Sequence, residues 1–371
     1  MSPHLGGHGT DGADAGLDPL ARLTGHCSLR KGGVVTKNGS PLSDQSVLVT
    51  GGTGFTGSHL IRQLTALGAH VRAIARPTSD RTSLEDCPVE WLLGDVFDPK
   101  CIETAMQDVS YVFHLATLYR SGAATEEEHR QVHLESTQLI ATAARQQSTF
   151  RRLVHVSTVG VHGHIEDPPA DETAPIRPGD EYQRTKAAAE QWLTAFASEH
   201  DLPYAIIRPA AIYGPGDRRL LKLFRMARRP IAPILGKRPC LYHLIHVEDL
   251  VNIMIQAANH PNALGEAFIA GNPTPIALDE MLRVIGAAWQ QQPRIWRLPI
   301  APFWAAAVCC EAICPRLGFR PPLYRRRIKF FLNDRAFDTR KLQTKLNYSY
   351  RYSNETGLQE TARWYRAQGW A

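Results

Sequence analysis

Short runs of apolar residues recur along the chain and are separated by segments with helical periodicity. The runs that predict buried strands are Ser46–Thr50, His70–Ala75, Val89–Leu93, Tyr111–Leu115, Leu153–Ser157, Tyr204–Arg208 and Ala267–Ala270. Helical patterns lie between most of these runs, as at Thr56–Gly68, Gln131–Gln146 and Glu181–Ala197. Short apolar strands that alternate with helices predict an α/β fold class with a doubly wound parallel sheet, covered by helices on both faces.

The two ends of the chain depart from this pattern. Residues 1–43 are rich in Gly, Asp, His and Ser and predict a mobile N-terminal extension. Leu298–Cys314 is a 17-residue apolar segment, but Pro299, Pro302 and Glu311 make it a poor membrane span. Basic residues follow it at Arg316, Arg320, Arg325, Arg326, Arg327 and Lys329. Three interpretations stay open: a helix at the interface of an anionic membrane, a lid over an apolar ligand, or a core helix with a solvated basic face.

Composition narrows the class of protein. The chain has 371 residues, of which 43% are hydrophobic and 21% charged, so it can bury a large core without disulfides. The net charge of +6 comes from 42 basic and 36 acidic residues rather than from one basic block, which argues against a nucleic-acid partner. The seven cysteines fit neither a disulfide framework nor a zinc site, so we expect no metal and a reducing compartment. We therefore expect a cytoplasmic protein without a secretory signal.

A glycine-rich loop follows the first predicted strand and precedes the first predicted helix. Its sequence, Thr50-Gly-Gly-Thr-Gly-Phe-Thr-Gly57, spaces glycines at Gly51, Gly54 and Gly57. Small residues at these places allow a tight turn and let backbone N–H groups approach a pyrophosphate, toward which the helix directs its positive N-terminus. The loop predicts a Rossmann-type sheet that binds a dinucleotide.

The end of the second predicted strand bears on the choice of dinucleotide. An acidic residue there would hold the ribose hydroxyls of NAD, but the strand ends at Ala75 and continues with Arg76. Arg76 can pair with a 2′-phosphate and Ser79 can donate a hydrogen bond to it, so the sequence favours NADP over NAD. The alternative is that Arg76 is a solvated residue that stacks on the adenine. Asp95 after the third strand is placed to accept a hydrogen bond from the adenine amino group.

Tyr182 and Lys186 stand four residues apart at the start of a predicted helix and therefore share one face. Oxidation of an alcohol needs a base, and a free phenol ionises near pH 10. A neighbouring ammonium and an oxidised nicotinamide ring both favour the phenolate. Ser157 and Thr158, at the end of the fifth strand, are each able to hold the reacting oxygen, and their spacing alone does not decide between them.

These motifs together are similar to those of the extended short-chain dehydrogenases/reductases of the epimerase/dehydratase type. The residues that carry the resemblance are Thr50–Gly57, Gly94-Asp95, His114-Leu-Ala116, Ser157-Thr158, Tyr182 with Lys186, Arg208-Pro209, Tyr213-Gly-Pro-Gly216 and His246-Val-Glu-Asp-Leu250. The resemblance runs from about Ser46 to the C-terminus and implies the catalytic residues Thr158, Tyr182 and Lys186. The cofactor-binding residues that it implies are Gly51, Gly54, Phe55, Thr56, Gly57, Arg76, Ser79, Asp95, Val96, Leu115, Ala116, Tyr182, Lys186 and Pro209.

The resemblance also implies a domain organisation. We expect a dinucleotide-binding Rossmann domain at 44–216 plus 247–272 and a small, mainly C-terminal, substrate-binding cap at 217–246 plus 273–371. Many relatives pair through the helix that carries the tyrosine and its neighbour, so a homodimer is an expectation by resemblance. Peripheral contact with the inner face of a membrane through 298–329 stays open.

Departures from the family pattern concern the substrate. Ala211 and Tyr242 stand where nucleotide-sugar enzymes carry the Asn and Arg that hold a diphosphate, which disfavours a nucleotide sugar. His133 replaces a usual Asn, and we assign it no role from sequence. The C-terminal part resembles 3β-hydroxysteroid and sterol-4-carboxylate 3-dehydrogenases.

We therefore expect an NAD(P)-dependent oxidoreductase acting on a secondary alcohol or ketone of a hydrophobic, sterol- or triterpenoid-like lipid, with decarboxylation of a 4-carboxylate as an option. The first alternative is a nucleotide-sugar epimerase or dehydratase. The second is a non-catalytic cofactor-binding scaffold, against which the presence of both Tyr182 and Lys186 argues.

Overall fold

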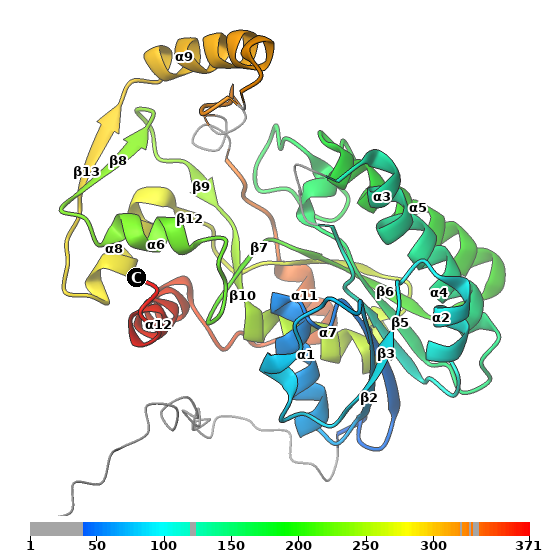
Figure 1. Cartoon of the computed structure of the whole chain (residues 1–371). Helices are drawn as coiled ribbons and strands as arrows, with labels where there is room; N and C mark the ends of the chain where they lie inside the picture. Colours follow the sequence, from blue (N-terminus) through cyan, green and yellow to red (C-terminus); the bar gives the residue numbers. More distant parts are fainter. Residues whose placement is uncertain (1–39, 119–123, 320, 326–327, 329–333) are drawn as a thin grey trace, which may run out of the picture. The chain divides into compact units, whose positions relative to one another are not determined.

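The computed structural model describes residues 40–118, 124–319, 321–325, 328 and 334–371 (Figure 1). Most of the predicted N-terminal extension, together with Arg320, Arg326, Arg327 and Lys329, lies outside the described residues. Leu42, which the sequence placed in the N-terminal extension, is fully buried in the main hydrophobic core.

A seven-stranded sheet forms the centre of the fold, and its strand order is β11-β6-β5-β4-β1-β2-β3. The strands are β1 (Ser46–Thr50), β2 (His70–Ala75), β3 (Val89–Leu93), β4 (Tyr111–His114), β5 (Arg152–Val156), β6 (Tyr204–Pro209) and β11 (Ala267–Ala270). Each neighbouring pair is parallel. The order reverses between β1 and β4, and a ligand crevice forms at such a switch point. The predicted doubly wound α/β sheet is confirmed.

Helices cover both faces of this sheet because successive strand residues point in opposite directions. Val49 packs into a core with α1 (Phe55–Ala66), α7 (Val247–Asn259) and α11 (Arg340–Leu346). Leu48 packs into the opposite core with α2 (Pro99–Ala105), α4 (Ser136–Arg145) and α5 (Glu181–His200). Alternate residues of β1 thus supply two cores at once.

The predicted helix at Gln131–Gln146 is not one regular α-helix. It consists of α3 (Glu126–Arg130), a π-helical turn at Gln131–Glu135 and α4. A π-turn inserts an extra residue into the helical ladder and often lies at a functional site. His133 lies in the middle of this turn. Short 3-10 turns occur at Thr82–Leu84, Val159–His162, Pro261–Ala263 and Cys314–Leu317.

A second hydrophobic cluster lies beside the sheet. Its centre contains Phe224, Leu282 and Tyr365. The elements around it are α6 (Leu221–Ala227), α8 (Leu278–Ala287), α12 (Asn354–Ala367), β8 (Ile231–Leu235), β13 (Arg294–Leu298), β9 (Leu241–Tyr242) and β12 (Ile276–Ala277). The short parallel pair β7 (Ala211–Tyr213) and β10 (Leu244–His246) connects it to the sheet.

The C-terminal segment returns to the sheet before it reaches α12. Leu342, Leu346 and Tyr348 pack in the sheet core, although the sequence assigned them to the cap. Asp249 of α7 fixes the segment around Tyr348 and Arg351 against the sheet. Its carboxylate accepts hydrogen bonds from the Tyr348 hydroxyl at 2.7 Å and from the Arg351 backbone N–H at 2.9 Å. The second cluster is therefore built from chain segments that interleave with those of the sheet.

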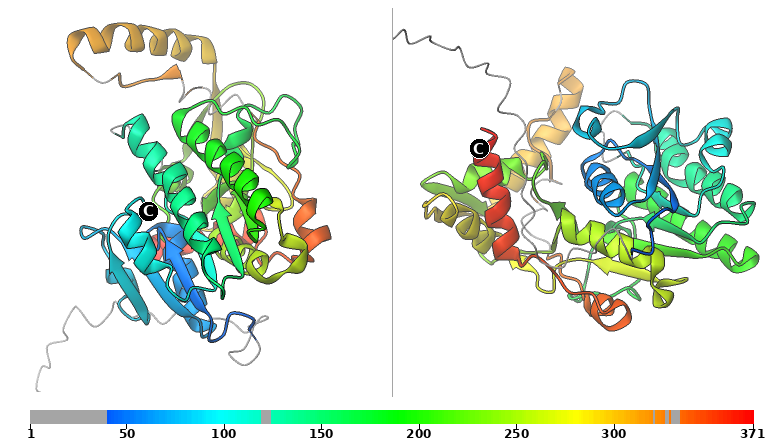
Figure 2. Two further views of the ribbon diagram at one scale, coloured as in Figure 1. Left: turned by 90° about the vertical axis from the view of Figure 1, so that its right-hand side faces the viewer. Right: turned by 90° about the horizontal axis from the view of Figure 1, so that it is seen from below.

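The helix α9 (Ile300–Ile313) extends away from the other described helices, and the perpendicular view shows the same (Figures 1 and 2). It follows β13 and precedes the basic stretch. Within the described ranges, no helix combines the length and the hydropathy that crossing a membrane requires.

A buried ion pair fixes α5 against β6. The Arg208 guanidinium donates to the Glu190 carboxylate at 2.6 Å, and both side chains are less than a tenth exposed. Arg208 also donates to the Glu172 carbonyl oxygen at 3.1 Å. The pair therefore sets where the face of α5 lies relative to the strand ends.

Because a lone buried carboxylate is costly, the Arg208→Met variant should lose about 3–5 kcal/mol of unfolding free energy. The double variant Glu190→Met/Arg208→Met removes both charges and should recover much of that loss. Urea unfolding measures both. Equal destabilisation of the single and double variants would show that the charge pair does not fix α5.

Candidate active site

One cavity of about 1500 Å³ opens at the carboxyl ends of the sheet strands and continues to the second cluster. Every residue that the sequence implicated in cofactor binding or catalysis lines it. These residues are Gly51, Gly54, Phe55, Thr56, Gly57, Arg76, Ser79, Asp95, Val96, Leu115, Ala116, Thr158, Tyr182, Lys186 and Pro209. They come from six strand ends and from α1 and α5, so the parallel topology brings them together.

The glycine loop forms a cradle that a side chain would fill. Gly51 has φ +72°, and a Cβ there would lie 2.8 Å from the Ala116 nitrogen. A Cβ on Gly57 would clash with the Gly51 carbonyl oxygen. The helix α1 begins after Gly54, and its first turn contains no acidic residue. The exposed backbone N–H groups and the positive helix end therefore fit the pyrophosphate of a dinucleotide.

The cavity wall beyond this loop carries the residues predicted to meet the adenosine end. Arg76 directly follows β2 and is exposed, and Ser79 closes a turn by donating its backbone N–H to the Arg76 carbonyl at 2.9 Å. Asp95 follows β3, and the Gly94 backbone N–H donates to the Ala75 carbonyl at 3.0 Å. The tips of β2 and β3 thus present a guanidinium, a hydroxyl and a carboxylate to one end of the cavity.

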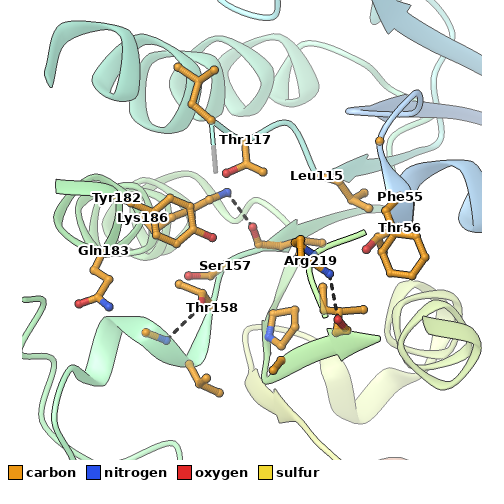
Figure 3. Close-up of a pocket in the computed structure, with 18 of the residues that line it drawn as sticks. Phe55, Thr56, Leu115, Thr117, Ser157, Thr158, Tyr182, Gln183, Lys186 and Arg219 are labelled. Atoms are coloured by element: carbon orange, nitrogen blue, oxygen red, sulfur yellow. Dashed lines mark hydrogen bonds between the residues drawn. The ribbon is translucent and has the colours of Figure 1, made fainter. Parts of the chain in front are cut away.

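Lys186 lies deep in the site and is only 1% exposed. Its ammonium donates a hydrogen bond to the Val156 carbonyl at 2.9 Å (Figure 3). Burial lowers the pKa of Lys186 to about 8, although the nearby Glu190 carboxylate opposes this shift. Tyr182, one helical turn earlier on α5, lies beside it (Figure 3).

Two hydroxyls lie next to the Tyr182 ring (Figure 3). The Thr158 hydroxyl accepts a hydrogen bond from the Gly160 N–H at 3.0 Å, which leaves its own proton free to be donated into the cavity. The Ser157 hydroxyl is buried and has no hydrogen-bond partner within the described residues. Both hydroxyls therefore remain able to hold a substrate oxygen.

His133 connects the π-turn to the helix that carries Tyr182. Its Nε2 accepts the Leu118 backbone N–H at 3.1 Å, so its proton sits on Nδ1 and is donated to the Thr185 hydroxyl at 2.8 Å. The His133 and Tyr182 rings meet edge to face with centroids 5.4 Å apart. Burial lowers the pKa of His133 to about 2, so the ring stays neutral. His133 therefore positions Tyr182.

The hydrogen-bond partners of His133 were not found from the sequence. Thr117 bonds to its Nε2 at 2.9 Å, and Thr185 bonds to its Nδ1. Thr185 directly precedes Lys186 on α5, and α5 packs against the π-turn that carries His133. The sequence offered one signal for this role, namely His133 at a position where the family usually has Asn. The hydrogen-bond partners of His133 could not be found in the same way, because Thr117 and Thr185 lie in segments that only the fold brings together.

The far end of the cavity differs chemically from the cofactor end. Apolar and aromatic residues line it, namely Ile212, Leu220, Leu223, Tyr242, Leu278, Met281, Trp304 and Phe337. Ala211 also lines the cavity, and Tyr242 is only 4% exposed. Burial raises the pKa of Tyr242, so its phenol stays neutral. Charged residues line the same cavity, among them Arg219, Arg325, Asp334 and Arg335, and the Arg335 guanidinium lies 5.8 Å from the centre of the Tyr242 ring.

A model of the NAD dependent epimerase/dehydratase family matches residues 47–271. The sterol demethylase protein B of Methylococcus capsulatus is 35% identical over 177 residues, which cover 47% of this chain and 53%, about half, of that protein. A 3-beta-hydroxysteroid dehydrogenase of Mycolicibacterium neoaurum is 27% identical over 86% of this chain and 91% of its own length. A UDP-glucose 4-epimerase of Vibrio cholerae is 26% identical over 70% of this chain and 80% of its own.

The fold is also that of solved structures. The UDP-glucose 4-epimerase of Thermotoga maritima superposes with a TM-score of 0.70 at 21% identity. The match covers 87% of this chain and 99% of that one. At this identity the likeness concerns the arrangement of the backbone.

The buried Lys186 makes stability depend on pH in a defined window. Between about pH 8 and 10.5 the unfolded chain keeps a proton that native Lys186 has released, so native stability rises with pH. The Lys186→Met variant lacks this rise. Its unfolding free energy relative to wild type should therefore fall by about 3 kcal/mol across the window in urea titrations.

The exposed Lys222→Met variant serves as the control and should show no such change. A Lys186→Met difference that stayed constant from pH 8 to 10.5 would show that the buried ammonium does not carry the shifted pKa.

Proposed function

The chain belongs to the NAD dependent epimerase/dehydratase family and is an NAD(P)-dependent oxidoreductase of the short-chain dehydrogenase/reductase type, and on this premise we propose its substrate. We propose that it interconverts the 3β-hydroxyl and 3-keto forms of a sterol- or triterpenoid-like lipid. The second cluster, with residues 217–246 and much of 273–371, is the proposed substrate cap. The site residues named above are the proposed catalytic and cofactor-binding set.

The apolar far end of the cavity is the observation that carries this proposal. A nucleotide sugar would bring a diphosphate, and burying it requires several well-placed donors. Ala211 offers no side-chain donor, and Tyr242 is a buried neutral phenol. A fused-ring lipid needs only apolar contact over most of its surface, and Leu223, Met281 and Phe337 supply that contact.

The functions of two relatives support the same substrate class. One is a sterol demethylase protein, and one is a 3-beta-hydroxysteroid dehydrogenase. The Vibrio cholerae relative is a UDP-glucose 4-epimerase, which keeps the nucleotide sugar as the competing substrate. The side chains at the far end of the cavity favour the lipid.

The cofactor site fits a nicotinamide dinucleotide, which supplies hydride chemistry when bound. The loop Gly51–Gly57 and the start of α1 would hold the pyrophosphate. Arg76 and Ser79 would hold a 2′-phosphate, so we propose NADP as the preferred form. Asp95 would accept from the adenine amino group, and Leu115, Ala116 and Pro209 would line the path toward Lys186.

Tyr182 is the proposed acid and base at the substrate oxygen. In oxidation its phenolate takes the hydroxyl proton, and in reduction its phenol returns it. The Lys186 ammonium, when protonated, favours that phenolate by charge. Thr158 donates its free proton to the substrate oxygen and holds it near Tyr182. His133 keeps the Tyr182 ring in place through edge-to-face contact and through Thr185.

A substrate with a carboxylate on C4 would have that group β to the new ketone. The bond from C4 to the carboxyl carbon can then break, and CO₂ leaves while the electron pair forms the enolate. Protonation of the enolate carbon restores the ketone. This step needs no further oxidant, so oxidation at C3 is sufficient to start it.

The Tyr182→Phe variant should bind NADP as wild type does, and its turnover of a 3β-hydroxysteroid should fall about 100-fold or more. Absorbance of the reduced nicotinamide measures turnover, with NAD and NADP compared. Tyr111→Phe is a matched control because Tyr111 is a buried tyrosine at the opposite end of β4, and it should keep its turnover.

The same assay includes UDP- and dTDP-sugars. Turnover of these sugars without turnover of any sterol or triterpenoid alcohol would replace the lipid hypothesis with the nucleotide-sugar one. Unchanged turnover in Tyr182→Phe would remove Tyr182 from its proposed role, whatever the substrate.

A further inference from the structure

The helix α9 exposes much of its apolar surface, although Ile300, Phe303, Trp304 and Cys310 are half-buried. Within Ile300–Ile313, all of which the structure describes, only Ala307 is buried. Val308 is 41% and Ile313 52% exposed. A helix that is apolar on all sides is normally enclosed by a protein core or by lipid. The described residues of this chain do not enclose α9, so the core-helix interpretation of this segment is wrong.

The helix α9 has one charged residue, Glu311, whose charge is neutralised by an ion pair with Arg325. Glu311 is its one carboxylate, and this group accepts hydrogen bonds from the Arg325 side chain at 2.5 Å and from the Arg325 backbone at 2.8 Å. Hydrogen bonds from the Arg325 backbone N–H and from its guanidinium lower the pKa of Glu311, so the pair stays ionised and internally neutralised. The remaining surface of α9 consists of Ala, Val, Ile, Pro, Phe, Trp and Cys side chains.

The length of α9 limits how it can meet a bilayer. Fourteen residues span about 21 Å, which is shorter than the hydrocarbon core of about 30 Å. The helix can therefore lie in the interface but cannot cross. Two exposed aromatic residues flank it, Trp296 at 60% and Phe319 at 69% exposure. Aromatic rings at both ends are typical of segments that rest at the level of lipid headgroups.

The charges that follow α9 in the sequence favour one kind of surface. From residue 300 to residue 329 the sequence contains one acid, Glu311, and the bases Arg316, Arg320, Arg325, Arg326, Arg327 and Lys329, of which Arg316 and Arg325 lie within the described residues. Apolar surface beside such a basic stretch is complementary to a bilayer that contains anionic lipids. A second copy of this chain would bring the same positive charges to the contact and would be repelled.

We infer that α9 and its flanking residues dock into the interface of an anionic lipid bilayer. Trp304 and Glu311 of α9 line the cavity described above, together with Arg325, the ion-pair partner of Glu311. Docking therefore holds the part of the cavity that Trp304 lines next to the lipid from which an apolar substrate would enter. The entry route rests on the proposed function, whereas the docking itself does not.

Vesicle flotation of the full-length protein, without cofactor or substrate, tests the docking. The wild type should float with vesicles of phosphatidylcholine and phosphatidylglycerol, and much less with phosphatidylcholine alone. Val308→Glu/Ile313→Glu should weaken binding to the mixed vesicles about tenfold or more, because it places two charges on the apolar face. Neither residue lines the cavity, so turnover of a water-soluble alcohol should be unchanged.

Leu264→Glu is the matched control, since Leu264 is 56% exposed and remote from α9 in sequence and fold; it should float like the wild type. Wild-type protein that stayed unbound with both vesicles would overturn the inference, as would equal flotation of the double variant. A wild-type dimer that the double variant turned into a monomer, without vesicle binding, would assign α9 to a second copy instead. None of these outcomes depends on which substrate is turned over.

Discussion

The carbonyl oxygen of Val156 holds the Lys186 ammonium inside the protein, and the rest of the site is arranged around that buried charge. Burial alone would expel or neutralise it. The Arg208–Glu190 pair fixes α5 against β6 and places a carboxylate near the ammonium. These contacts fix α5 relative to the sheet. Because Tyr182 lies one turn before Lys186 on the same helix, they also fix the place of Tyr182.

The π-turn at Gln131–Glu135 also fixes the first turn of α5, through contacts of His133. It brings His133 against the Tyr182 ring and against Thr185, so that the first turn of α5 is held by contacts on two sides. A neutral histidine can do this because its two ring nitrogens take different roles, one accepting from Leu118 and the other donating to Thr185.

Much of the fold could be predicted from sequence because its signals are local. The strands β1 to β6 are short, mainly apolar runs, and the loop Gly51–Gly57 leaves no room for a side chain at Gly51 or Gly57. The parallel topology then dictates that strand-end residues meet. The return of Leu342 and Tyr348 to the sheet core could not be predicted in this way, because it depends on hydrogen bonds to the distant Asp249. The exposure of α9 was equally hidden, since an apolar run is compatible with a core, a lid or a lipid surface.

We propose that Tyr182, Lys186 and Thr158 serve hydride transfer at C3 of a lipid alcohol bound in the cavity. The most direct measurement uses a 3β-hydroxysteroid with deuterium on C3, incubated with oxidised cofactor and followed by mass spectrometry of the reduced cofactor. The account predicts reduced cofactor that carries the deuterium, together with the 3-keto product. Unlabelled cofactor and unchanged steroid, alongside turnover of a nucleotide sugar in the same preparation, would contradict it.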